Sequence, residues 1–168
     1  AMREFQVRTS HRPRPLPAGR WVMAQRWNDL LYAHWPLPPE ALTVLLPQGL
    51  QVDTWHGSAW LGLLPFWMDR IKFRGLPTIP GARHAPELNL RTYVRDPHTG
   101  TPGVYFLSLD TSSLISVAFA RTLYGLPSHW ADMRIEQRSE REFFFAGRRL
   151  FSRSAATFAA RYRGLGPT

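Results

Sequence analysis

The stretch Glu87-Leu88-Asn89-Leu90-Arg91-Thr92-Tyr93-Val94-Arg95 alternates between two kinds of side chain. One set is mostly apolar, and the other carries a carboxylate, an amide, a guanidinium and a phenol. Because successive side chains of a strand point to opposite faces of a sheet, this period of two predicts a β-strand. The turn-rich residues 96–103 follow, and Val104–Leu109 then predicts a partner strand that runs back. An antiparallel hairpin is therefore the local unit of the fold.

The rest of the chain repeats this pattern of short strands and tight turns. Further strands are predicted at Asn28–Trp35, Leu50–Trp55, Ala59–Met68, Asp132–Arg138, Glu142–Arg149 and Thr157–Tyr162, with 50–55 and 59–68 forming a hairpin around His56-Gly57-Ser58. Two short helices are predicted, over 39–46 and over Ser112–Tyr124. Ser112 or Ser113 is available as N-cap of the second, and Gly125 as its C-terminal glycine. These elements predict a mainly β (α+β) fold, an antiparallel sandwich or barrel.

Composition bounds the class of protein. The 168 residues have a net charge of +9, no cysteine and 44% hydrophobic residues, which is typical of one folded domain without disulfides. Residues 1–20 are basic and proline-rich and predict an extended lead-in, followed by a single domain over 21–168. Since no apolar run reaches the roughly 18 residues of a membrane span, we expect a cytoplasmic protein without membrane contact.

Six motifs, in this order, resemble the uncharacterised YqjF-like family. They are Ala33–Pro39, Leu46–Leu50, Gly62–Phe66, Pro86–Val94, Gly103–Asp110 and Tyr124–Pro127. That family is similar to a superfamily built around acetoacetate decarboxylase. The resemblance implies an antiparallel β-barrel-like, acetoacetate decarboxylase-like fold that encloses an internal pocket. It also implies a domain truncated at its C-terminus, because such proteins continue for several tens of residues beyond the equivalent of Thr168.

The catalytic lysines of that superfamily are not matched here. In the decarboxylase, Gly-x-Pro precedes two adjacent lysines, of which one forms a Schiff base and the other depresses its pKa. This chain keeps Gly125-Leu126-Pro127 but continues with Ser128 and His129. Its single lysine, Lys72, stands among 20 arginines and is interpreted as a solvated side chain. Schiff-base chemistry is therefore disfavoured.

Two groups of residues are candidates for a site. The strand face that carries Glu87 must meet either water or a lined cavity, and Ser128-His129 takes the place where the related enzyme performs its chemistry. The predicted roles are acid/base catalysis by His129 and Glu87, and substrate binding by Arg91, Asn89, Tyr93, Ser128 and Arg121. The alternatives are a solvated strand face, on which a Glu87–Arg91 pair is worth little, and an ordinary loop at Ser128-His129.

These candidates predict a protein that binds a small organic acid or carbonyl compound in an internal pocket. If it is an enzyme, lyase or hydrolase-like acid/base chemistry fits better than iminium formation. The alternatives are a non-catalytic ligand-binding module and a basic protein that binds nucleic acid without sequence specificity. Nucleic acid is disfavoured, because the arginines are dispersed and no binding motif occurs. We expect no metal, since no histidine pair has zinc spacing, and we expect no cofactor. The sequence leaves open whether the protein forms a homo-oligomer.

Overall fold

The computed structural model describes residues 18–75, 84–151 and 156–165. Its strands are β1 (Met23–Asn28), β2 (Ala33–Leu37), β3 (Gln51–Val52), β4 (Ala59–Phe73), β5 (Ala85–Arg95), β6 (Pro102–Thr111), β7 (Ser128–Gln137), β8 (Glu142–Arg149) and β9 (Thr157–Arg163), and its helices are α2 (Pro39–Thr43) and α3 (Leu114–Tyr124). Most of the predicted 1–20 lead-in lies outside the described residues. In the described part of the chain, neither helix is long and apolar enough to cross a membrane.

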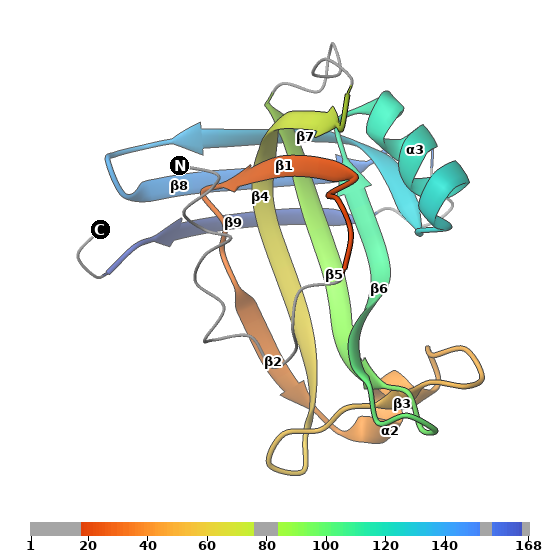
Figure 1. The fold of residues 1–168 in the computed structure, drawn as a ribbon. Helices are drawn as coiled ribbons and strands as arrows, with labels where there is room; N and C mark the ends of the chain where they lie inside the picture. Colours follow the sequence, from red (N-terminus) through yellow and green to blue (C-terminus); the bar gives the residue numbers. More distant parts are fainter. Residues whose placement is uncertain (1–17, 76–83, 152–155, 166–168) are drawn as a thin grey trace.

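The strands form one bent, mixed sheet in the order β1-β4-β5-β6-β7-β8-β9, with β2 added on β4 and β3 on β5 (Figure 1). All pairings are antiparallel except β6–β7, which α3 connects as a parallel crossover. Within the described residues, the end strands β1 and β9 pair with β4 and β8 and not with each other. The mainly β fold with two helices is confirmed, and the word barrel describes its curvature rather than a closed sheet.

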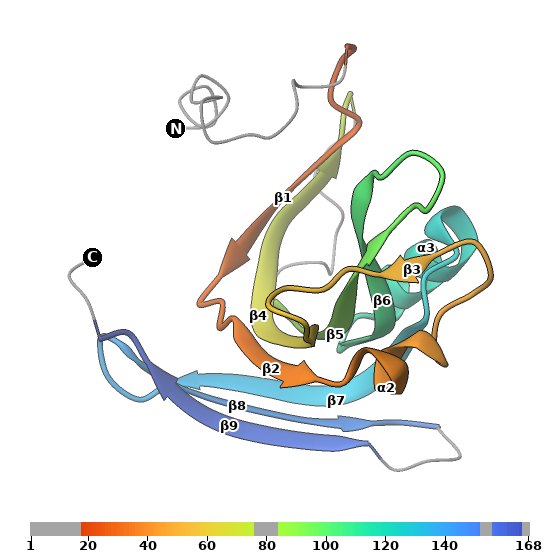
Figure 2. The same ribbon diagram turned by 90° about the horizontal axis from the view of Figure 1, so that it is seen from below.

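The long strand β4 organises two layers. Its first half pairs with β2 and its second half with β1, and its curvature brings β1 over the face of the sheet on which α3 also lies (Figure 2). The strands β7, β8 and β9 lie on the opposite side of the sheet, behind β4 and β5 in Figure 1 and below them in Figure 2. Tyr162 of β9 donates a hydrogen bond to the Asp29 carbonyl oxygen at 2.6 Å, which ties this second layer to the β1–β2 connection.

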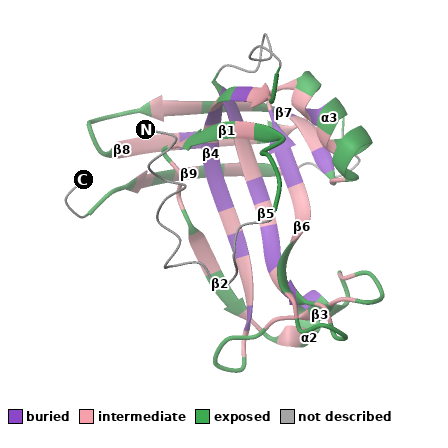
Figure 3. Cartoon of the chain, viewed as in Figure 1, coloured by how far each residue is buried: buried purple, intermediate pink, exposed green. Residues whose placement is uncertain are grey.

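The buried core follows the middle of β4, β5 and β6 (Figure 3). Leu64, Phe66, Met68 and Ile71 of β4 form one apolar cluster, against which Leu30 packs. Several buried positions of β5 are polar, because Asn89, Arg91 and Thr92 are all at most 9% exposed. Buried polar side chains require partners or a lined cavity, so this strand leads to the candidate site.

Local signals predicted some elements well. The β5–β6 hairpin and α3 form as expected, with Ser113 as the N-cap of α3 and Gly125 in the left-handed conformation at its C-terminus. The other predicted hairpin is wrong. Residues 50–55 contribute only the two-residue β3, which pairs with β5, and a single bridge joins Trp55 to Ser58. The strand predicted at 28–35 spans the end of β1 and the start of β2, which are separated by Asp29 at φ 51°.

Candidate functional site

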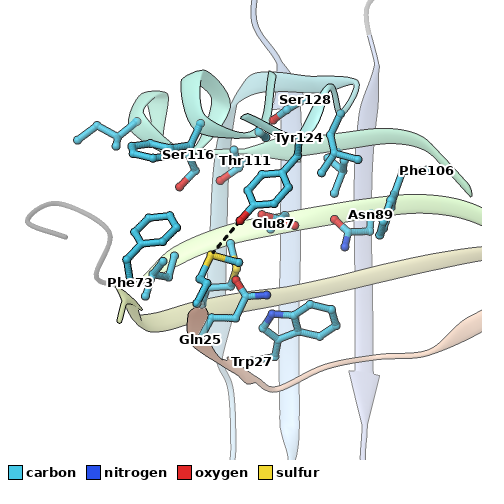
Figure 4. A pocket seen from close by; sticks show the side chains of 18 residues that line it. Gln25, Trp27, Phe73, Glu87, Asn89, Phe106, Thr111, Ser116, Tyr124 and Ser128 are labelled. Carbon is cyan, nitrogen blue, oxygen red and sulfur yellow. Dashed lines mark hydrogen bonds between the residues drawn. The ribbon is translucent and has the colours of Figure 1, made fainter. Parts of the chain in front are cut away.

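A cavity of about 300 Å³ lies between α3, β1 and the face of β4–β6 opposite the second layer (Figure 4). Its walls are mostly apolar. Its lining consists of Met23, Gln25, Trp27, Met68, Ile71, Phe73, Glu87, Asn89, Phe106, Leu109, Thr111, Ile115, Ser116, Phe119, Ala120, Tyr124, Leu126 and Ser128. Among the described residues that line it there is no arginine, lysine or histidine, so these residues offer polar groups without a cation.

Glu87 is the carboxyl group of this cavity. It sits on β5 opposite Phe66 of β4 and Thr111 of β6. Burial raises the pKa of Glu87 to about 7, and a side-chain hydrogen bond with Asn89 opposes that rise. A carboxyl group with such a pKa exchanges its proton near neutral pH, which suits a general acid or base.

Asn89 stands beside Glu87 on the same face of β5. Its side chain is 1% exposed, and its Oδ1 atom has no hydrogen-bond partner within the described residues. A buried carbonyl oxygen without a donor is costly. In a cavity wall, this oxygen can accept a hydrogen bond from a bound molecule.

Ser128 reaches the cavity because of the turn that follows α3. Gly125 adopts φ 61° and ends the helix, after which the Ser128 amide donates to the Leu126 carbonyl oxygen at 2.8 Å. Arg121 donates from Nε to the Ser128 carbonyl oxygen at 2.6 Å. Arg121 therefore holds this turn in place and is not part of the cavity lining, whereas Ser128 is 1% exposed and lines it.

His129 lies on the other face of the sheet. It pairs in register with Asp110 of β6, and side chains at paired positions share a face. Asp110 is bound there by Arg149, with a closest approach of 2.7 Å, and Arg149 also donates to Ser108. Burial lowers the pKa of His129, and the Arg149 charge lowers it further. The structure thus does not bring His129 together with Glu87 in the cavity.

Arg91 and Tyr93 share the strand face of Glu87 but lie farther along β5, beyond the cavity lining. Tyr93 contacts His34 of β2, with 2.6 Å between its hydroxyl and His34 Nε2. Arg91 packs over the Tyr32 and Tyr93 rings. Of the predicted site residues, Glu87, Asn89 and Ser128 therefore meet in one cavity, while Arg91 and Tyr93 form a second cluster.

Lys72 does not line the cavity either. Its neighbours Ile71 and Phe73 do, and alternation along β4 turns Lys72 to the opposite side. Its Nζ lies 5.7 Å from the centroid of the Trp21 ring. The described residues also contain no group of three side chains suited to hold a metal ion.

The cavity has polar residues that the sequence did not single out. Gln25 and Trp27 come from β1, a strand whose position was mispredicted, and Thr111 and Ser116 come from the end of β6 and the start of α3. Tyr124 of α3 also lines the cavity, and its hydroxyl approaches the Met23 sulfur at 4.0 Å across it (Figure 4). The alternation of Gln25 and Trp27 along one strand face was the available signal.

Solved structures show the fold. Acetoacetate decarboxylase from Legionella pneumophila matches 79% of this chain and 50% of its own length, with 16% identity and a TM-score of 0.51. An acetoacetate decarboxylase-like enzyme from Sphingomonas wittichii matches 73% and 50%, with 17% identity and a TM-score of 0.55. The enduracididine biosynthesis enzyme MppR, complexed with a condensation product of pyruvate, has a TM-score of 0.54 at 13% identity. At such identities these likenesses concern the fold alone.

Sequence comparison shows the family. Uncharacterized protein YqjF of Bacillus subtilis (strain 168) is 45% identical over 148 residues, which are 88% of this chain and 60% of YqjF. The chain thus spans less than two thirds of the length of that relative. The DUF2071 family (uncharacterized conserved protein, COG2071) matches residues 24–168. The resemblance carried by the six motifs is thereby confirmed, and the chain belongs to the DUF2071 family.

Proposed function

We propose that this chain binds a small carbonyl compound, or a small organic acid in its protonated form, in the cavity lined by Glu87, Asn89 and Ser128. One observation carries the proposal: Glu87 is a partly buried carboxyl group whose pKa is raised by burial to about 7, in a mostly apolar cavity to whose lining the described residues contribute no cation. The protonated carboxyl group donates a hydrogen bond to a carbonyl oxygen, and apolar walls favour an uncharged ligand.

The chemistry that fits this site is proton transfer. Glu87 gives or takes a proton near neutral pH, the Asn89 amide oxygen accepts from a ligand hydroxyl, and the Ser128 side chain bounds the same space. Iminium formation is disfavoured, since Lys72 points away from the cavity. Acetoacetate or pyruvate treated with borohydride should therefore leave no stable adduct on Lys72, and mass spectrometry that finds one would overturn this mechanism.

Ligand binding is tested by thermal melting, because a ligand that binds the folded state raises Tm. Acetoacetate and its uncharged methyl ester form a matched pair of probes. We expect the ester to raise Tm at pH 6 and less at pH 8, where ionised Glu87 no longer donates to its carbonyl oxygen. Acetoacetate should lose nearly all of its effect at pH 8, because ionised Glu87 also repels it.

Two variants complete this test. Glu87→Gln should abolish the pH dependence of the acetoacetate response, because its side chain does not titrate. Glu140→Gln, at an exposed position between β7 and β8, should behave like the unmodified protein. The proposal fails if neither probe raises Tm, or if Glu87→Gln retains the pH dependence.

A non-catalytic ligand-binding module is the second candidate function. The position of His129 favours it, because this second predicted acid/base group lies on the opposite face of the sheet and leaves Glu87 without a histidine partner. Proton NMR of acetoacetate or pyruvate incubated with the protein separates the two functions. A binding module raises Tm without consuming either compound, whereas an enzyme consumes one of them at a rate that Glu87→Gln reduces.

A further inference from the structure

Arg91 is a buried cation whose charge is not balanced by the described residues around it. Its side chain lies on β5 opposite Gly62 of β4 and Phe106 of β6, and the residue is 9% exposed. Within the described part of the chain it makes no ion pair, and its Nε atom is buried without a hydrogen-bond partner. Burying a charge in this way is costly unless an opposite charge and hydrogen bonds compensate it.

The surroundings of Arg91 orient its guanidinium group. The central guanidinium carbon lies 5.3 Å from the centroid of the Tyr32 ring and 5.8 Å from that of Tyr93. Aromatic faces attract a guanidinium and fix its plane, but they do not use its N–H donors. Tyr32 is 54% exposed, so the cluster extends from a buried cation to the protein surface.

His34 does not compete as a second charge. Burial and the nearby Arg91 both lower its pKa, so the imidazole is neutral at neutral pH. Its Nε2 lies 2.6 Å from the Tyr93 hydroxyl. A Cβ atom at Gly62 would meet His34 Nε2 at 3.1 Å and Arg91 Cγ at 3.4 Å. A glycine at this position therefore leaves the room that His34 and Arg91 need to approach each other.

This cluster is separate from the cavity of Glu87. Arg91 lies four residues beyond Glu87 on the same strand face, which is about 13 Å at the usual rise per residue. Phe106, which pairs with Arg91, lines the cavity, whereas Tyr32, His34, Arg91 and Tyr93 do not. Arg91 is also not among the causes of the raised Glu87 pKa.

We propose that Arg91, flanked by Tyr32, His34 and Tyr93, is a binding site for the carboxylate of a small organic acid. The planar guanidinium presents Nε–H and Nη–H side by side, which matches the two oxygens of a carboxylate. The aromatic rings beside the guanidinium lower the local dielectric, which strengthens this contact. The site does not depend on the proposed function of the Glu87 cavity, which takes uncharged molecules.

The test follows the Nε–H signal of Arg91 by NMR in the whole chain at pH 8, where His34 is neutral. The signal is assigned by its absence in Arg91→Lys. Acetate is the probe, acetamide the uncharged control of the same shape, and chloride the control for ionic strength. We expect a saturable shift with acetate at one site per chain, and no saturable shift with either control.

Variants separate this site from other arginines and from the cavity. Arg91→Met should weaken acetate binding at least tenfold. Arg134→Met removes an exposed arginine that also packs on an aromatic ring, and Glu87→Gln alters only the cavity, so both should leave acetate binding unchanged.

Three results overturn the proposal. The first is an Arg91 signal that acetate does not move, as when a carboxylate of the chain itself already holds the guanidinium. The second is an equal response to acetamide or chloride. The third is a loss of binding in Arg134→Met as large as in Arg91→Met. The first two comparisons need only the unmodified chain, so they decide the question even if Arg91→Met does not fold.

Discussion

Replacing Glu87 with glutamine removes the titrating carboxyl group of the cavity and should change how stability depends on pH. The pKa of Glu87 rises from 4.5 to about 7 in the folded chain. Between these values the unfolded chain has released the proton while the folded chain still holds it. Stability therefore falls as pH rises from 4.5 to 7, and the loss persists above pH 7. At about 1.4 kcal/mol per pH unit, it amounts to about 3 kcal/mol.

The assay is urea unfolding of both proteins at half-unit steps from pH 3 to 8.5. Glutamine does not titrate, so the stability of Glu87→Gln relative to the unmodified chain should grow by about 3 kcal/mol up to pH 7 and then stay constant. The lowered pKa values of His34 and His129 act with the opposite sign, since stability then rises with pH. They cancel in the difference between the two proteins.

Glu140→Gln, on an exposed turn, is the matched control and should show a difference that hardly changes with pH. The reasoning is refuted if the Glu87→Gln difference is equally flat across this range. A difference that grows between pH 3 and pH 4.5, with the opposite sign, would show instead that Glu87 is ionised and paired.

Three further substitutions test other contacts by urea unfolding. Asp110→Asn should cost about 3 to 5 kcal/mol, because it leaves the largely buried Arg149 without its carboxylate, and a loss below 1 kcal/mol would contradict this pairing. Gly62→Ala should lower the free energy of unfolding by about 1 kcal/mol or more. It should also shift the NMR signals of His34, because the His34 Nε2 atom would lie 3.1 Å from the new Cβ. Unchanged His34 signals would contradict that contact. Gly125→Ala should cost about 1 to 2 kcal/mol, because φ is 61° there, and an unchanged stability would contradict the left-handed C-cap.

The fold could be predicted where local signals decide it. The alternation in Glu87–Arg95 and the turn after it set the β5–β6 hairpin, and a capping serine and a glycine delimit α3. The hairpin predicted around Gly57 failed because β3 pairs with β5, which is distant in sequence. Nothing in the residues 50–55 themselves favours that partner, since strand pairing depends on the whole sheet.

The sequence predicted which face of β5 carries the candidate residues, but not how far along that strand the cavity reaches. Alternation correctly put Glu87, Asn89, Arg91 and Tyr93 on one face of β5, yet the strand outruns the cavity, so the last two residues lie beyond it. The resemblance directed attention to Ser128-His129, but neighbours on a strand face opposite ways. Of these two residues, only Ser128 lines the cavity. The alternation of Gln25 and Trp27 indicates a shared strand face, but it does not show that the curvature of β4 brings this face over the cavity.

The face shared by Glu87 and Arg91 carries two opposite electrostatic environments. If the two side chains formed an ion pair, the guanidinium would lower the pKa of Glu87, but burial raises it to about 7. Glu87 therefore meets a neutral, apolar space, whereas Arg91 carries a charge that the described residues around it leave uncompensated. A ligand suited to one place is unsuited to the other: an uncharged carbonyl compound gains little from Arg91, and a carboxylate is repelled by ionised Glu87. The two proposals thus predict ligands of different charge, which acetate and methyl acetoacetate distinguish.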